Sequence, residues 1–74
     1  MESVRLVSMA NQIGQFFESQ GDAAVAIAGI ADHLQKFWDP RMRRELAEYL
    51  ERGGSGVAPL VAEAVREIAR KHRR

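Results

Sequence analysis

Apolar residues recur at helical spacing along the whole chain, and no segment alternates as a half-buried strand would. The first stripe predicts a helix over about residues 3–18, and it consists of Leu6, Met9, Ala10, Ile13, Phe16 and Phe17. After a break at Gly21, with Asp22 as a plausible N-cap, the second predicts a helix over about residues 23–38, consisting of Ile27, Ile30, Ala31, Leu34, Phe37 and Trp38. The two stripes superimpose at an offset of 21 residues. We attribute this match to two similar helices that bury similar faces in an antiparallel hairpin, in preference to an internal duplication.

Two further helices follow. Proline disfavours an α conformation at Asp39 and suits the first helical position, so a third helix is predicted over about residues 40–52. The glycines of Gly53–Gly56 predict a turn, and a fourth helix is expected over about residues 58–72. The apolar positions of these two helices are Met42, Leu46, Tyr49 and Leu50, then Val61, Ala64, Val65 and Ile68.

These elements predict an all-α fold, a small bundle of about four helices with short turns. The chain has 74 residues and no cysteine, so we expect one domain over residues 1–74 without disulfides, with residues 69–74 as a frayed basic tail. Apolar burial nearly cancels ordering entropy in a chain this short. We therefore expect marginal stability alone and a larger partner, or self-association, to supply the rest.

No residue is predicted to be catalytic or to hold a metal or cofactor. The turn glycines are not followed by the Lys-Ser/Thr of a phosphate-binding loop. His33 has no nucleophile or partner base spaced to serve it and is interpreted as structural. His72, on the apolar face of the fourth helix near its end, is interpreted as structural or disordered. Glu45, Glu48 and Glu51 have arginine neighbours, in i,i+4 pairs such as Arg41/Glu45, Arg44/Glu48 and Glu48/Arg52, and are interpreted as a solvated surface.

The two halves of the chain carry opposite net charge. Residues 1–40 carry two cations against five carboxylates, a net charge of −3, whereas residues 41–74 carry nine against five, a net charge of +4. Five cations among residues 66–74 allow an alternative, a small self-associating helical regulator that binds nucleic acid through this tail. No aromatic residue interleaves with them, and cations complement a helix C-terminus, so nucleic-acid binding is not favoured. No membrane span or signal peptide is predicted, and the expected location is the cytoplasm.

Arg41, Arg43 and Arg44 open the third predicted helix, where positive charge opposes the helix dipole. They do not stabilise their own first turn, which suggests that another protein binds them. The small residues Val25, Ala28 and Gly29 lie opposite the apolar stripe of the second helix and suggest either ordinary surface or a second docking face.

Three segments carry a family resemblance, and together they extend over roughly residues 4–66. They are Met9-Ala10-Asn11-Gln12-Ile13-Gly14 with Phe16-Phe17; Ile30-Ala31-Asp32-His33 leading to Lys36-Phe37-Trp38-Asp39-Pro40-Arg41-Met42-Arg43; and Gly53-Gly54 with Gly56 and Pro59-Leu60-Val61. The Trp-Asp-Pro-x-Met-Arg core is the distinctive part. With these segments the chain resembles the small delta subunit of soluble, NAD-dependent, molybdenum- or tungsten-containing formate dehydrogenases.

The resemblance implies a non-catalytic accessory subunit in a hetero-oligomer with the large catalytic subunit. In that family the catalytic subunit oxidises formate at a molybdenum or tungsten bound by two pterin guanine dinucleotides. Iron–sulfur clusters and FMN in other subunits pass electrons to NAD. The delta subunit carries no cofactor and is associated with assembly or stabilisation of the complex. A maturation chaperone that later leaves is the remaining possibility.

The partner interface is expected to be formed or supported by Trp38, Arg41, Met42 and Arg43, because tryptophan and arginine often concentrate binding energy. Asn11 and Gln12, which face away from the first apolar stripe, are expected to add polar contacts. For Trp38, packing in the core is an equally open alternative, and part of the Arg43 stem is expected to be buried.

Overall fold

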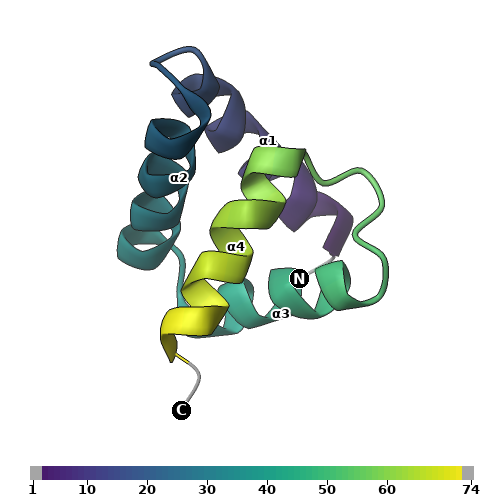
Figure 1. The fold of residues 1–74 in the computed structure, drawn as a ribbon. Helices are drawn as coiled ribbons and strands as arrows, with labels where there is room; N and C mark the ends of the chain where they lie inside the picture. Colours follow the sequence, from purple (N-terminus) through teal and green to yellow (C-terminus); the bar gives the residue numbers. More distant parts are fainter. Residues whose placement is uncertain (1–2, 73–74) are drawn as a thin grey trace.

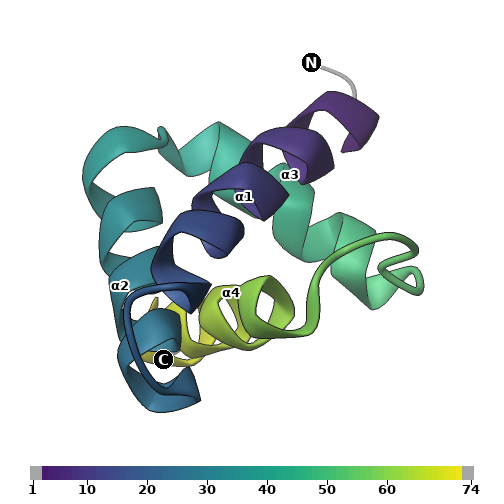
Figure 2. The ribbon, with the colours of Figure 1, turned by 90° about the horizontal axis from the view of Figure 1, so that it is seen from above.

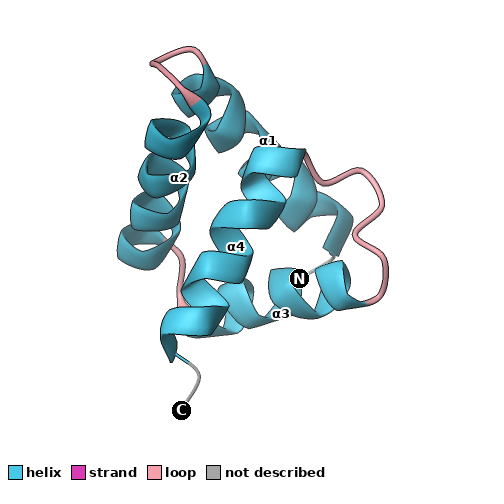
Figure 3. Ribbon diagram, viewed as in Figure 1, coloured by secondary structure: helices cyan, strands magenta, loops and turns pink. Residues whose placement is uncertain are grey.

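Four helices follow one another in the computed structural model, which describes residues 3–72 and the side chains of residues 3–71. They are α1 (Ser3–Glu18), α2 (Ala23–Phe37), α3 (Pro40–Glu51) and α4 (Pro59–His72), and the described residues contain no strand (Figure 3). The all-α class and the four predicted helices are confirmed, with each end within one residue of its expected position. α4 continues through residues 69–72, which were expected to fray, and residues 73–74 of that tail lie outside the described residues.

Side-chain caps begin the two central helices. The Asp22 carboxylate accepts a hydrogen bond from the Val25 backbone N–H at 3.0 Å, and the Asp39 carboxylate accepts one from Met42 at 2.9 Å. Both caps satisfy backbone donors that a helix start leaves without partners, and Pro40 follows at the first helical position. The Asp39-Pro40 boundary therefore forms as the sequence predicts.

Glycines end α3. The Gly54 N–H donates to the Tyr49 carbonyl and the Gly53 N–H donates to the Leu50 carbonyl, each at 3.0 Å, which is the Schellman pattern. Gly53, Gly54 and Gly56 all have positive φ, a region that side chains with a Cβ seldom adopt. The turn glycines are thus explained by helix termination.

The helices are inclined to one another around one core. α4 packs most extensively against α2, while α1 contacts each of the other three helices. In Figure 1, α4 lies in front of α1 and α3 runs below both. In Figures 1 and 2, α1 and α2 diverge from their connecting turn, so the expected antiparallel hairpin is not specifically confirmed.

Every helix contributes side chains to the core. Its fully buried large side chains are Leu6, Ile30, Leu34, Leu46 and Val61. The apolar stripe predicted for α4 is buried in full. α1 and α4 approach closely at Gly14, where an added Cβ would lie 2.7 Å from Val61 Cγ2.

Two aromatic residues predicted for the core are not in it. Phe16 is 60% exposed and Phe37 is 72% exposed. The buried face of α1 is rotated toward Val7 and Gly14, which leaves Phe16 at its edge. Phe37 is the last residue of α2, and Trp38 turns inward after it.

Candidate partner interface

The residues expected at the interface do not form one surface. Trp38 and Met42 lie largely inside the domain. Trp38 is only 6% exposed and belongs to the buried core, and Met42 is half-buried against that core. The burial of Trp38 agrees with the core alternative, so these two side chains can shape a surface from beneath but present little area to a partner.

Asn11 has an internal role that the sequence did not reveal. Its Nδ2 donates to the Gly56 carbonyl at 2.9 Å, and its Oδ1 accepts from the Ala58 N–H at 3.0 Å. The Tyr49 hydroxyl donates to the Ser55 carbonyl of the same loop at 2.6 Å. The side chain of Asn11 therefore fastens the α3–α4 loop to α1, and its amide is already engaged on both sides. Gln12, the next residue, is exposed.

The arginines at the start of α3 have no carboxylate partner among the described residues. The described residues form only two ion pairs, Lys36–Asp32 on α2 at 3.2 Å and Arg66–Glu63 on α4 at 3.8 Å. The three i,i+4 pairs predicted along α3 are thus wrong. Glu45 instead accepts a hydrogen bond from the Ser3 hydroxyl at 3.3 Å. Arg41 and Arg44 are exposed and Arg43 is half-buried, as expected for its stem.

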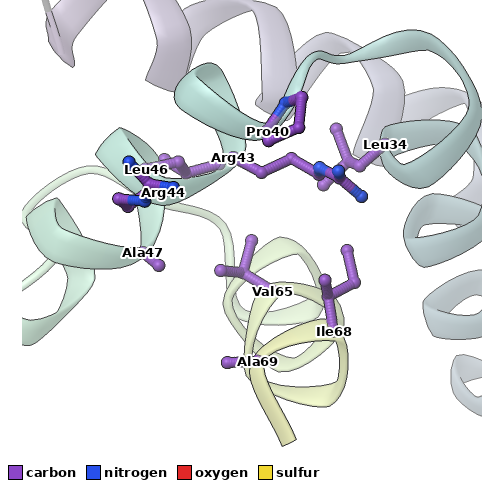
Figure 4. Close-up of a pocket in the computed structure, with 9 residues that line it drawn as sticks. All are labelled: Leu34, Pro40, Arg43, Arg44, Leu46, Ala47, Val65, Ile68 and Ala69. Carbon is purple, nitrogen blue, oxygen red and sulfur yellow. The ribbon is translucent and has the colours of Figure 1, made fainter. Parts of the chain in front are cut away.

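Arg43 and Arg44 border an open hollow, here called the α3–α4 groove, with a volume of about 430 Å³. Figure 4 shows Arg43 extending from α3 toward Leu34 on α2, with Val65 and Ile68 on α4 pointing back toward α3. The lining is apolar apart from the two guanidinium groups. Its residues are Leu34, Pro40, Arg43, Arg44, Leu46, Ala47, Val65, Ile68 and Ala69.

A second feature, here called the aromatic surface, consists of Phe16, Phe17, His33 and Phe37 on α1 and α2. Consecutive rings lie 5.1, 6.4 and 4.7 Å apart between centroids, so they form a continuous row. A shallow hollow beside it is lined by Gln12 and by Trp38 at its edge. The predicted interface residues are therefore divided between two places, with Arg43 at the groove and Gln12 at the aromatic surface.

The small-residue strip predicted on α2 is interrupted. Val25 and Ala28 are exposed, but the Phe17 ring covers Gly29 so closely that an added Cβ would lie 2.4 Å from Phe17 Cδ1. The glycine lets an aromatic ring of the same chain pack against the helix backbone. Its position is explained within the domain.

The groove and the hollow of the aromatic surface are lined by apolar, aromatic and arginine side chains, with Gln12 and His33 among them. No polar or charged side chain is buried among the described residues, and none of them gather into a group of three metal-ligating side chains. No helix of the described part is both long and apolar enough to cross a bilayer. Apolar hollows flanked by arginine and aromatic side chains are typical of surfaces that bind proteins.

The structure is that of a small all-α domain with an apolar groove edged by arginines and a row of aromatic rings at its surface. Residues 5–65 match the family model described as NADH-dependent formate dehydrogenase delta subunit FdsD. The chain belongs to this family, which confirms the resemblance drawn from its motifs. Searches of curated proteins and of solved structures found no match to the chain.

Proposed function

We propose that this protein is a non-catalytic accessory subunit of a cytoplasmic NAD-dependent formate dehydrogenase, docking on the large catalytic subunit and stabilising or helping to assemble the complex. The family match over residues 5–65 is the observation that carries this proposal. The exposed phenylalanines support it, as do the arginines at the start of α3, which have no ion-pair partner among the described residues, because aromatic and arginine side chains are enriched where proteins bind one another.

In this proposal the cofactors lie in the other subunits. The chain has no cysteine for an iron–sulfur cluster, and its described residues offer no cluster of metal ligands. Oxidation of formate to carbon dioxide at molybdenum or tungsten, and electron transfer through iron–sulfur clusters and FMN to NAD, are assigned to the partner subunits.

The proposed role of each predicted interface residue depends on how far its side chain is exposed. Arg41, Arg43 and Gln12 present polar groups to the partner, while Trp38 and Met42 fix the surface from inside. Asn11 acts indirectly by holding the α3–α4 loop against α1. Arginine suits this role because its planar group forms two parallel hydrogen bonds with a carboxylate.

Co-purification with a tagged catalytic subunit tests the proposal. The wild-type chain is expected to be recovered with the catalytic subunit, and Arg41→Glu plus Arg43→Glu is expected to reduce both recovery and formate-dependent NAD reduction. Arg5→Glu plus Arg52→Glu is the matched control, since it makes the same charge change at exposed positions elsewhere. If the wild-type chain is not recovered with the catalytic subunit at any stage, the proposed function is wrong.

The stage of binding separates the two forms of the proposal. A structural subunit stays at fixed stoichiometry in the mature, active enzyme. A maturation chaperone is found on the catalytic subunit before cofactor loading and is absent afterwards. Comparing the two purified forms of the catalytic subunit decides between them.

A further inference from the structure

We infer that the α3–α4 groove is the docking site for an amphipathic, acidic segment of the partner, whose apolar side chains enter the groove and whose carboxylates pair with the arginines along its edges. This inference rests on the proposed function and adds to it the surface used and the chemistry of the bound segment.

The base of the groove is formed by side chains of the core. Leu46 and Val65 are almost completely buried, yet both line the hollow, so its walls are well-packed side chains rather than mobile surface. Ala47 on α3 and Ala69 on α4 leave the space open, because neither extends beyond its Cβ. An apolar side chain of a partner can fill this space and remove both surfaces from water.

The groove continues along the two helices. A second hollow shares Ala47, Val65 and Ala69 with the first and extends past Leu50 to Arg70. The two together form an elongated depression between α3 and α4. Such a shape fits a helix or an extended chain, which recognises a groove through side chains at several successive positions.

Charge identifies the kind of segment. Arg43 and Arg44 edge the groove on α3, and Arg66 and Arg70 edge its continuation on α4, against a single lining carboxylate, Glu51. Of these four arginines, only Arg66 has an ion-pair partner among the described residues, a long 3.8 Å contact to Glu63 at the surface. Four guanidinium groups around an apolar floor are complementary to a segment with carboxylates beside its apolar residues.

A second copy of this chain is a poorer occupant. The large exposed apolar residues Phe16 and Phe37 belong to the aromatic surface, whose hollow is edged by the neutral Gln12. The nearby Asp32 is already paired with Lys36. No carboxylate lines the hollow of the aromatic surface, so that hollow offers the arginines of the groove no matching charge.

Filling the groove tests the inference without changing charge. Ala69→Leu places a larger side chain in the hollow, and Ala24→Leu makes the same change at an exposed α2 position that lines neither part of the groove. Each variant is co-expressed with the tagged catalytic subunit, and the ratio of the two chains is measured after purification. Ala69→Leu is expected to lower the ratio at least tenfold, whereas Ala24→Leu leaves it unchanged. Circular dichroism of each isolated variant checks that the helices form.

Reversing charge provides an independent variant if Ala69→Leu does not fold. Arg44→Glu plus Arg70→Glu is expected to reduce the ratio at least tenfold, with Arg5→Glu plus Arg52→Glu as control. The wild-type complex is also expected to lose the small chain as salt is raised, because exposed charges are screened.

Three results overturn the inference. If folded groove variants stay bound as wild type does, the proposed function stands but the docking site is elsewhere. Loss of binding only on Phe16→Ser plus Phe37→Ser assigns docking to the aromatic surface. Sedimentation showing that the isolated wild-type chain is a dimer and Ala69→Leu a monomer makes a second copy the occupant. Failure of the wild-type chain to bind contradicts the proposed function itself.

Discussion

At the scale of single residues, the polar side chain with the clearest structural role is Asn11. It lies at the edge of the apolar stripe of α1, and its amide donates to one backbone group of the α3–α4 loop and accepts from another. An asparagine side chain is suited to this, because its amide carries a donor and an acceptor side by side. The loop contains three glycines with positive φ, and besides the cap of α3 its backbone is held by a hydrogen bond from the Val57 N–H to the Gly54 carbonyl at 3.1 Å.

Asn11→Ala is expected to lower the free energy of unfolding by about 1–2 kcal/mol, because the half-buried Ala58 N–H loses its acceptor. Urea denaturation followed by circular dichroism measures the change. Gln12→Ala is the matched control, since Gln12 is exposed and forms no hydrogen bond with the described residues, and a shift within about 0.5 kcal/mol is expected. Equal effects of the two substitutions would show that Asn11 does not fasten the loop.

Gly14 marks the closest approach of α1 and α4. Gly14→Ala is expected to destabilise the domain by about 1–3 kcal/mol, because the new methyl would lie 2.7 Å from the stiff Val61 side chain. This cost exceeds the roughly 0.5–1 kcal/mol that alanine adds to a helix over glycine. Gly21→Ala, where the nearest atom is 3.9 Å from the new Cβ, is expected to cost nothing. A thermal midpoint for Gly14→Ala at or above wild type would contradict the close packing.

At the scale of helices, the sequence specifies where each one begins and ends. Asp22 and Asp39 are N-caps, Pro40 fits the first helical position, and Gly53 lies where a helix terminates. These signals are local, so they can be seen in the sequence without knowing the fold. The three-dimensional arrangement is not local, and the sequence did not reveal that α2 packs most extensively against α4.

Asp39→Ala removes the cap of α3 and is expected to cost about 1 kcal/mol, which corresponds to a fall of about 4–8 °C in the thermal midpoint of a domain of this size. Asp39→Asn keeps an oxygen that can accept from the Met42 N–H and is expected to retain most of the stability. Thermal unfolding of both variants gives the comparison. If the alanine variant matches wild type, the cap does not contribute to holding α3.

Helical periodicity also explains which buried and exposed positions were predictable from the sequence. It identified Leu34 and Leu46 as core positions, but it also assigned Phe16 and Phe37 to the core. Periodicity gives the face of a helix and not how far neighbouring helices extend along it, so side chains near helix ends were placed wrongly. The same limit applies to the α3–α4 groove, because the groove forms only where Ala47 on α3 and Ala69 on α4 line the same space.

At the scale of the whole molecule, the domain is a small all-α core with substantial apolar and cationic surface. Two of its three phenylalanines are mostly exposed, and the arginines at the start of α3 have no carboxylate partner among the described residues. A domain of this size buries a smaller share of its surface than a larger one does, so binding to a partner contributes directly to its stability. The family to which the chain belongs indicates association with a formate dehydrogenase complex.

Native mass spectrometry of the formate dehydrogenase complex, isolated through a tag on its catalytic subunit, tests the central claim most directly. The account predicts that this chain is present at a fixed ratio to the catalytic subunit, either in the active enzyme or in its cofactor-free precursor, and that deleting its gene lowers the yield of active enzyme. Absence of the chain from both forms, together with an unchanged yield after deletion, would contradict the account.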